Sequence, residues 1–221
     1  MVVQDGLRRM FAEQEDVFYY ITLMNENYEH PAMPEGVEEG IKKGMYPFRQ
    51  GEGEAGAPRV QLLGSGTILR EVIAAADLLR DDWGVAADVW SCPSFTELAR
   101  DGVDVERWNL LHPEAAPRQS WVESCLEGTQ GPVVAASDYI RAFTEQIRPY
   151  VPKRYRTLGT DGFGRSDYRR RLRHFFEVDR RWVTLAALES LAREGAVPAG
   201  RVGEAIKKYG IDPDKPNPAK V

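Results

Sequence analysis

The chain reads Val60-Gln61-Leu62-Leu63-Gly64-Ser65-Gly66-Thr67, an apolar run that ends in a turn containing two glycines. A short apolar run bounded by turn residues is typical of a buried strand in a parallel sheet. The apolar residues that follow recur at helical spacing and predict a helix over residues 68–80, and residues 87–92 form the next apolar run. Strand, helix and strand make a right-handed βαβ unit, so the fold class is α/β.

The alternation of strands and helices continues toward the C-terminus. Further strands are predicted at 132–136 and 155–158, and further helices at 95–99, 105–110, 121–126 and 139–147. The last third is helical, over 167–175, 182–192 and 201–209, and ends in an irregular, proline-containing tail at 212–221. We expect a three-layer α/β/α sandwich with a mostly parallel sheet.

The residues before Arg59 have a different character. Apolar side chains at helical spacing predict a helix at the start of the chain, and Val17–Met24 is β-branched and aromatic throughout, which predicts a strand covered on both faces. A proline- and glycine-rich stretch follows, with a short helical piece near 37–43, and we interpret residues 35–58 as a linker. The sequence therefore predicts three parts: 1–34, 35–58 and 59–221.

Composition narrows the class of protein. The 221 residues are 43% hydrophobic and 29% charged, with a net charge of -5, which gives no general reason to expect nucleic-acid or membrane binding. Cys92 and Cys125 lack any metal-ligand spacing and are predicted to be free thiols in a reducing cytosol. No apolar run reaches the ~20 residues that a spanning helix needs, so we expect a soluble, cytoplasmic protein.

Several motifs occur in a fixed order along the chain. Asn25-Glu26-Asn27-Tyr28 and Pro31-Ala32-Met33-Pro34 come first, then Leu62-Leu63-Gly64-Ser65-Gly66-Thr67 and Pro93-Ser94-Phe95-Thr96-Glu97-Leu98, and last Gly159-Thr160-Asp161-Gly162-Phe163-Gly164-Arg165-Ser166-Asp167. This series resembles the C-terminal region of the homodimeric bacterial pyruvate dehydrogenase decarboxylating (first) component. That family is thiamine diphosphate-dependent and belongs to the transketolase-like superfamily, and the resemblance covers nearly the whole chain.

The resemblance implies a place for each part of the chain. Residues 1–34 are expected to be the last helix and strand of a pyrimidine-binding domain, and 59–221 a transketolase-like C-terminal domain. In the family the whole enzyme converts pyruvate to carbon dioxide and reductively acetylates lipoyl groups with thiamine diphosphate and Mg2+. Its partners are a homodimer mate and the dihydrolipoyl acetyltransferase component.

The family's cofactor-binding motif and its main proton-transfer residues match nothing in this sequence. We therefore expect a fragment with no cofactor of its own, inactive alone, that serves as a structural and dimerisation domain. Two other functions stay open: an anion- or effector-binding α/β module, and a part of a transketolase or of another 2-oxo acid dehydrogenase.

Asn25, Glu26 and Asn27 follow the predicted strand at 17–24, at the edge where open α/β sheets bind ligands. In transketolases, which this region resembles, the corresponding strand ends in a substrate-facing Arg-Gln-Asn stretch. Asn25 replaces that arginine, which fits a substrate without phosphate, such as pyruvate. A capped, hydrogen-bonded turn explains the same residues equally well.

Seven arginines between 165 and 181 form a basic cluster, in which Arg165, Arg169 and Arg173 are candidate contacts to an anion or a partner. A solvated face paired with Asp167, Glu177 and Asp179 is the favoured alternative, because consecutive arginines point around a helix. Ser166 is expected to cap the helix that follows, and the neighbouring glycines to serve backbone turning.

The remaining motifs favour structural roles. Gly64-Ser65-Gly66 lies where a helix N-terminus could hold an anion, but Leu69 stands where a dinucleotide motif needs glycine, and no phosphate-loop lysine follows. We interpret these residues as a tight turn. His30, His112 and His174 are isolated from other metal-ligating residues, so no metal site is expected.

Overall fold

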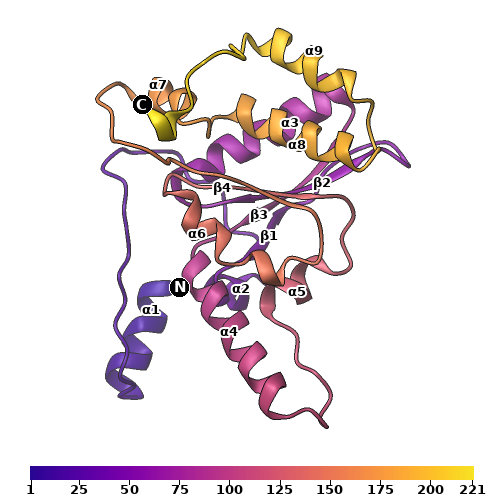
Figure 1. The fold of residues 1–221 in the computed structure, drawn as a ribbon. Coiled ribbons are helices and arrows are strands. Elements are labelled where there is room, and N and C mark those ends of the chain that lie inside the picture. The colour runs from indigo at the N-terminus through magenta and orange to yellow at the C-terminus, as the bar shows by residue number, and fades with distance from the viewer.

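The computed structural model describes residues 1–221 and contains one five-stranded sheet between two layers of helices (Figure 1). The strands lie in the order β1 (Tyr46–Arg49), β3 (Ala86–Ser91), β2 (Arg59–Gly64), β4 (Val133–Ala136) and β5 (Tyr155–Leu158). All neighbours are parallel except β1, which pairs antiparallel with β3. The predicted α/β fold with a mostly parallel sheet is confirmed.

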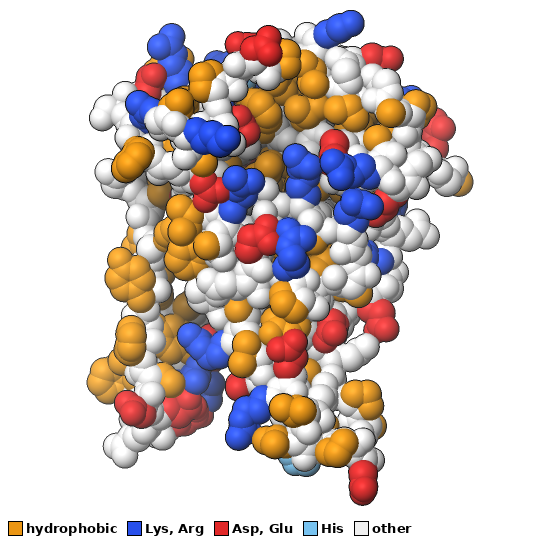
Figure 2. Space-filling view, viewed as in Figure 1, with side chains coloured by type: hydrophobic (Ala, Val, Ile, Leu, Met, Phe, Trp, Pro, Cys, Tyr) orange, Lys and Arg blue, Asp and Glu red, His pale blue; other side chains and the backbone are white.

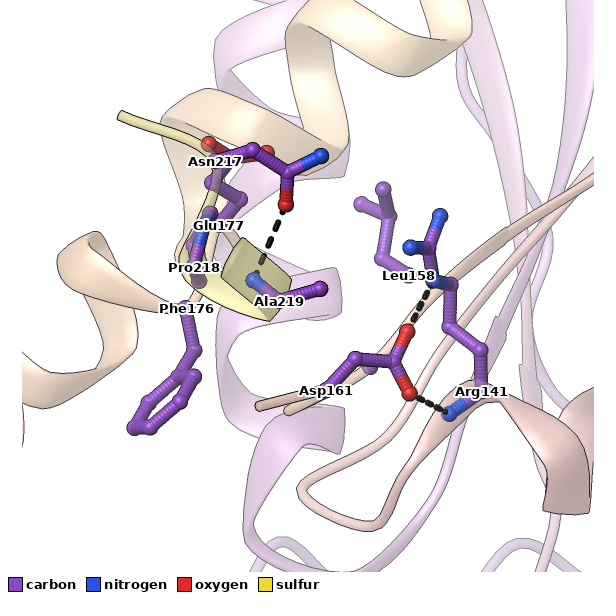
Figure 3. Close-up of a pocket in the computed structure, with 9 residues that line it drawn as sticks. Arg141, Leu158, Asp161, Phe176, Glu177, Asn217, Pro218 and Ala219 are labelled. Atoms are coloured by element: carbon purple, nitrogen blue, oxygen red, sulfur yellow. Dashed lines mark hydrogen bonds and ion pairs between the residues drawn. The ribbon is translucent and has the colours of Figure 1, made fainter. Parts of the chain in front are cut away.

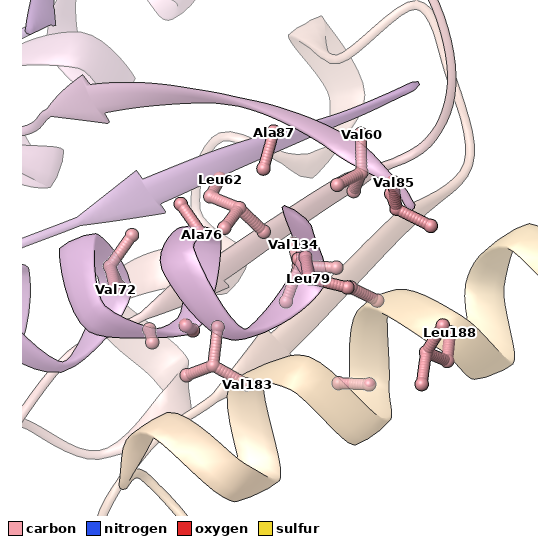
Figure 4. Packing of buried hydrophobic residues seen from close by; sticks show 14 of the residues in the cluster. Val60, Leu62, Val72, Ala76, Leu79, Val85, Ala87, Val134, Val183 and Leu188 are labelled. Atoms are coloured by element: carbon pink, nitrogen blue, oxygen red, sulfur yellow. The ribbon is translucent and has the colours of Figure 1, made fainter. Parts of the chain in front are cut away.

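One face of the sheet is covered by α3 (Leu69–Trp83), α8 (Arg180–Arg193) and α9 (Gly200–Tyr209). Figure 4 shows how the apolar side chains of α3 and α8 meet those of the strands. Leu62 of β2, Leu79 of α3 and Leu188 of α8 are fully buried. Burial of such side chains contributes about 1.5–3 kcal/mol each relative to exposure, so this cluster is what holds α3 and α8 on the sheet.

The opposite face packs against α4 (Phe95–Leu111), α5 (Trp121–Leu126) and α6 (Arg141–Glu145). Its cluster joins Leu63 and Trp90 of the sheet to Leu98 of α4 and Leu126 of α5. Side chains alternate along a strand, so Leu62 and Leu63 enter opposite layers. The three-layer arrangement follows from this alternation.

The prediction of two short helices at 95–99 and 105–110 is wrong, because α4 is one helix of 17 residues. Gly102 lies in its middle without breaking it. A Cβ at this position would lie 2.2 Å from Cε2 of Tyr150. The glycine therefore permits a close approach of the tyrosine ring and is no helix end.

The N-terminal residues form α1 (Val2–Leu7) and a π-helical turn at Arg8–Ala12, as expected. The predicted strand at 17–24 is wrong: these residues run extended without joining the sheet. Phe18, Tyr20 and Leu23 are 85, 86 and 88% exposed, and Figure 2 shows hydrophobic side chains along this segment at the left. No other strand of the chain lies beside the segment, so its backbone groups have no ladder to enter.

The stretch interpreted as a linker contains the expected short helix, α2 (Glu38–Lys43), and also β1, which was not expected. Met45, between them, is fully buried. Pro47 of β1 has no N–H to donate, which suits an edge strand. Met45 and β1 thus pack on the sheet, while the boundaries 1–34, 35–58 and 59–221 stay predictions.

The C-terminal part contains α7 (Arg169–Phe175), α8 and α9, and its tail is irregular apart from one helical turn at Pro218–Lys220. Ser166 does not cap α7: the N-cap residue is Tyr168, without a side-chain capping bond. None of the helices combines the length and the apolar character that crossing a membrane requires.

Candidate functional site

The carboxyl ends of β2 and β4 form a topological switch point. The chain leaves β2 for β3 on one side, whereas it leaves β4 for β5 on the other. In open α/β sheets, ligands bind in the crevice at such a point. Gly66 follows β2 and Asp138 follows β4; a Cβ at Gly66, whose φ is +53°, would lie 3.5 Å from Oδ1 of Asp138.

The side chain of Arg173 reaches from α7 to this switch point. Its Nη2 donates to Oγ1 of Thr67 over 2.9 Å, and its Nη1 donates to Oε1 of Glu71 over 3.2 Å. Only 14% of the Arg173 side chain is exposed. The chain's own guanidinium therefore lies beside the start of α3, in contact with Thr67 and Glu71.

Glu71 ties α7 and α8 to α3. Its Oε2 accepts hydrogen bonds from the backbone N–H and the Nε of Arg180, at 3.1 and 2.9 Å. Burial by itself raises the pKa of Glu71, but the hydrogen bonds and positive charge of Arg180, together with Arg173, outweigh it and lower the pKa below its ordinary value. Glu71 is thus a buried, ionised carboxylate.

Asp138 differs from Glu71 because no arginine contacts it directly. Burial raises its pKa, and its own backbone N–H and the more distant charge of Arg173 oppose that shift only in part. The carboxyl group beside the glycine turn is therefore protonated at a higher pH than an exposed aspartate. The switch point carries one firmly ionised acid and one weaker acid.

Tyr28 connects the N-terminal segment to the switch point. Its hydroxyl accepts from Nη2 of Arg173 over 3.1 Å and donates to Oε2 of Glu26 over 2.7 Å. The guanidinium carbon of Arg70 lies 3.8 Å from the centre of its ring, a cation–π contact. Between residues 20 and 33, Tyr28 is the one residue that is not exposed. It is the anchor of this segment.

Arg169 joins the two predicted sets of site residues. Its Nη2 donates to Oδ1 of Asn25 over 2.7 Å, and its Nη1 pairs with Oε2 of Glu26 at 2.7 Å. Asn27 is exposed and has no side-chain hydrogen bond within the chain. Arg165 lies apart from them, with its guanidinium carbon 5.2 Å from the ring centre of Phe175.

The arginines of the cluster thus make two kinds of contact: some pair at the surface, and others bind distant parts of the chain. Arg171 pairs with Asp167 at 3.9 Å on the surface, as the favoured interpretation expected. Glu177 instead pairs with Lys215, and Asp179 accepts from the backbone N–H groups of Arg181 and Trp182 at the start of α8. The partners of Arg169 and Arg173 come from the N-terminal segment, from α3 and from Thr67 in the turn before α3.

Sequence reasoning missed Thr67, Arg70, Glu71 and the anchoring role of Tyr28. One signal was available for Glu71. It stands at helical spacing between Ile68 and Ala75, on the apolar face of α3. A carboxylate on a buried face needs a charged partner, and this requirement points to an arginine from elsewhere in the chain.

A small cavity lies beside the loop that follows β5 (Figure 3). It has a volume of about 100 Å³, and Arg141, Asp161 and Asn217 contribute its polar groups. The backbone N–H and the Nε of Arg141 both donate to Asp161. Gly162, with φ +109°, lies against the carbonyl of Pro218, which a Cβ would approach to 2.2 Å. The glycines here serve turning and close packing.

The residues of this chain do not fit thiamine diphosphate or Mg2+. Cavities that hold organic ligands measure about 300–1,000 Å³, whereas those beside Arg141 and Arg49 measure about 100 and 70 Å³. No three His, Cys, Asp or Glu side chains lie close enough together to hold a metal ion. At the switch point, the guanidinium of Arg173 already contacts Thr67 and Glu71.

Comparison with protein families gives two matches. Residues 44–179 match the transketolase-like C-terminal domain, and residues 1–31 match the pyruvate dehydrogenase E1 component middle domain. The chain belongs to the transketolase-like C-terminal domain family. The first match covers the sheet, the switch point and α7, and the second ends three residues beyond Tyr28.

Comparison with curated proteins is more specific. The chain is 70% identical over 221 residues to a pyruvate dehydrogenase E1 component of Cupriavidus necator, 63% over 219 residues to that of Pseudomonas aeruginosa, and 55% over 220 residues to that of Escherichia coli. These alignments cover 99–100% of this chain but 24–25% of each relative. The expected resemblance to this component is confirmed, and the chain spans about a quarter of the length of its relatives.

Proposed function

We propose that this chain is the C-terminal part of a pyruvate dehydrogenase decarboxylating component. The identity to the three relatives over the whole chain supports this function. The whole enzyme then converts pyruvate to carbon dioxide and passes the acetyl unit reductively to a lipoyl group. It works in the cytoplasm as a homodimer with a dihydrolipoyl acetyltransferase component, and uses thiamine diphosphate and Mg2+ held by other parts of the protein.

Within that enzyme, Asn25, Glu26 and Asn27 face the substrate. The observation that carries this assignment is the attachment of the segment: Tyr28 and Arg169 fix it at the switch point, while the side chain of Asn27 stays free for an outside partner. Asparagine in place of the phosphate-binding arginine of transketolases suits a substrate such as pyruvate, which has no phosphate group.

The exposed apolar residues of the N-terminal segment indicate its role. Phe18 and Tyr20 alternate with the less exposed Val17, Tyr19 and Ile21 along an extended backbone, as in a strand that enters a sheet. We infer that residues 1–34 complete the pyrimidine-binding domain, that 35–58 lead into residues 59–221, and that these last residues pack on that domain and support the dimer. The chain by itself is then a structural domain that does not turn over pyruvate.

A chimeric enzyme tests this function. The region of the Cupriavidus necator component that aligns with this chain is replaced by these 221 residues, and pyruvate-dependent reductive acetylation is measured with its acetyltransferase component. We expect kcat within about tenfold of the unmodified enzyme, that is, within about 1.4 kcal/mol of its activation free energy, because the exchanged regions are 70% identical. A folded, dimeric chimera without pyruvate turnover would contradict the proposal.

A further inference from the structure

The N-terminal segment touches the body of the molecule at few points. Tyr28 is its sole residue between 20 and 33 that is not exposed, and Oγ1 of Thr22 accepts one further bond from the hydroxyl of Tyr139 over 2.9 Å. No backbone ladder holds residues 17–34. The placement of Asn25 and Glu26 therefore depends on a few side-chain contacts.

These contacts form a chain of bonds that starts in the core. Glu71 is buried on α3 and holds Nη1 of Arg173. With that nitrogen fixed, Nη2 points to Thr67 and to the hydroxyl of Tyr28. The bond at one nitrogen fixes the direction of the other because the donors of a planar guanidinium lie in a rigid fork.

Tyr28 connects Arg173 to the N-terminal segment. Its ring lies under Arg70, and its hydroxyl donates to Glu26, the same carboxylate that Arg169 pairs with. Arg169 also holds Asn25. Arg173 and Arg169 are one helical turn apart on α7, so a single helix carries both clamps.

We propose that Arg173, oriented by Glu71, is a positioning residue that fixes Asn25 and Glu26 through Tyr28. The C-terminal domain thereby sets the geometry of the segment that faces the substrate, at a switch point that takes an internal guanidinium instead of a ligand. The catalytic half of this inference rests on the proposed function, whereas the positioning half concerns this chain alone.

The positioning half is tested on the 221-residue chain by the distance between two spin labels. One label is attached through Asn27→Cys and the other through Glu204→Cys, which is exposed on α9. Cys92 is fully buried and burial raises the pKa of the half-buried Cys125 to about 11, so both native thiols react slowly; the unsubstituted chain measures their background labelling.

We expect a narrow distance distribution in the parent and in Arg171→Ala, a matched control on the exposed side of α7. Arg173→Ala should broaden the distribution about twofold or more, because a released segment samples dimensions that grow with the square root of its length. A narrow distribution in a folded Arg173→Ala variant, or a broad one in the parent, overturns the proposal. If Arg173→Ala does not fold, as judged by circular dichroism, Tyr28→Phe decides in its place by the same criterion. That variant keeps the ring and removes only the hydroxyl that accepts from Arg173.

The catalytic half is tested in the chimeric enzyme. There Tyr28→Phe should lower kcat/KM for pyruvate by about tenfold to a hundredfold, the scale on which misplaced groups slow enzymes. The loss should fall on kcat more than on KM, and Arg171→Ala should leave both constants unchanged. An unchanged kcat/KM in Tyr28→Phe overturns this half. An inactive chimera refutes the proposed function instead, and the label distances still decide the positioning role.

Discussion

Glu71 accepts three hydrogen bonds from Arg180: from its backbone N–H at 3.1 Å, from its Nε at 2.9 Å and from its Nη2 at 3.4 Å. The first residue of α8 is thereby fixed to α3, 109 positions earlier in the sequence. The same carboxylate holds Arg173 on α7. One buried acid therefore determines how two helices of the C-terminal third meet the sheet layer.

Glu71→Gln should lower the free energy of unfolding by about 2–4 kcal/mol at neutral pH, since it leaves two arginines without their buried partner. Urea denaturation measures the loss. Glu189→Gln is the matched control: that carboxylate pairs with Arg156 and Arg193 at the surface, where the expected loss is under about 1 kcal/mol. Equal losses of unfolding free energy in the two variants would show that the ion pairs of Glu71 stabilise the fold no more than those of a surface carboxylate.

The same ion pair makes stability depend on pH. The folded-state pKa of Glu71 lies below its ordinary value of 4.5, so the contribution is complete above pH 4.5 and is lost as pH falls through the folded pKa. The parent should therefore lose more stability than Glu71→Gln on acidification below pH 4.5. Parallel curves of unfolding free energy against pH for the two proteins would show that Glu71 does not titrate in this way.

Gly102→Ala should destabilise the chain by about 1–3 kcal/mol, although alanine favours helices, because the added Cβ would overlap the ring of Tyr150. Gly203→Ala on α9 is the matched control, since nothing lies within 4 Å of its Cβ position. There alanine should stabilise by up to about 1 kcal/mol. The thermal unfolding midpoint should fall in Gly102→Ala and rise in Gly203→Ala. Shifts of the same sign in both variants would contradict the close packing of α4 against Tyr150.

The hydroxyl of Tyr209 accepts from Nε1 of Trp83 over 2.8 Å and donates to Asp82 over 2.9 Å. Burial chiefly, together with the Asp82 carboxylate, raises the pKa of Tyr209 from 10 to about 12. Its contribution to stability is thus full below pH 10 and is lost as pH rises through about 12. Tyr209→Phe should cost about 1–2 kcal/mol at pH 8 and flatten the alkaline loss, as followed by denaturation from pH 8 to 12.

The regular α/β part of the fold was predictable because its signals are local. The apolar runs at 60–63 and 155–158 and the helical spacing from Ile68 to Leu79 specify strands and helices without knowledge of their neighbours. The strand β1 was missed because four residues that include Pro47 carry little local signal, and their order comes from pairing with β3.

Residues 17–24 show the opposite case. Their composition favours a strand, but a strand forms only where another strand accepts its hydrogen bonds. The candidate site was predicted in pieces for a similar reason. Asn25, Glu26 and Arg173 could be singled out individually, whereas the contact between Arg173 and Glu71 joins residues 102 positions apart, and only the folded topology brings them together.

We propose that these residues form a structural and positioning domain whose cofactor and reaction belong to other parts of a larger enzyme. Calorimetric titration of thiamine diphosphate with Mg2+ into the isolated chain, followed by a pyruvate decarboxylation assay on the same sample, tests it most directly. We predict no saturable heat of binding and no release of carbon dioxide. Saturable binding with turnover would mean that a complete catalytic site lies within these 221 residues, and would contradict the account.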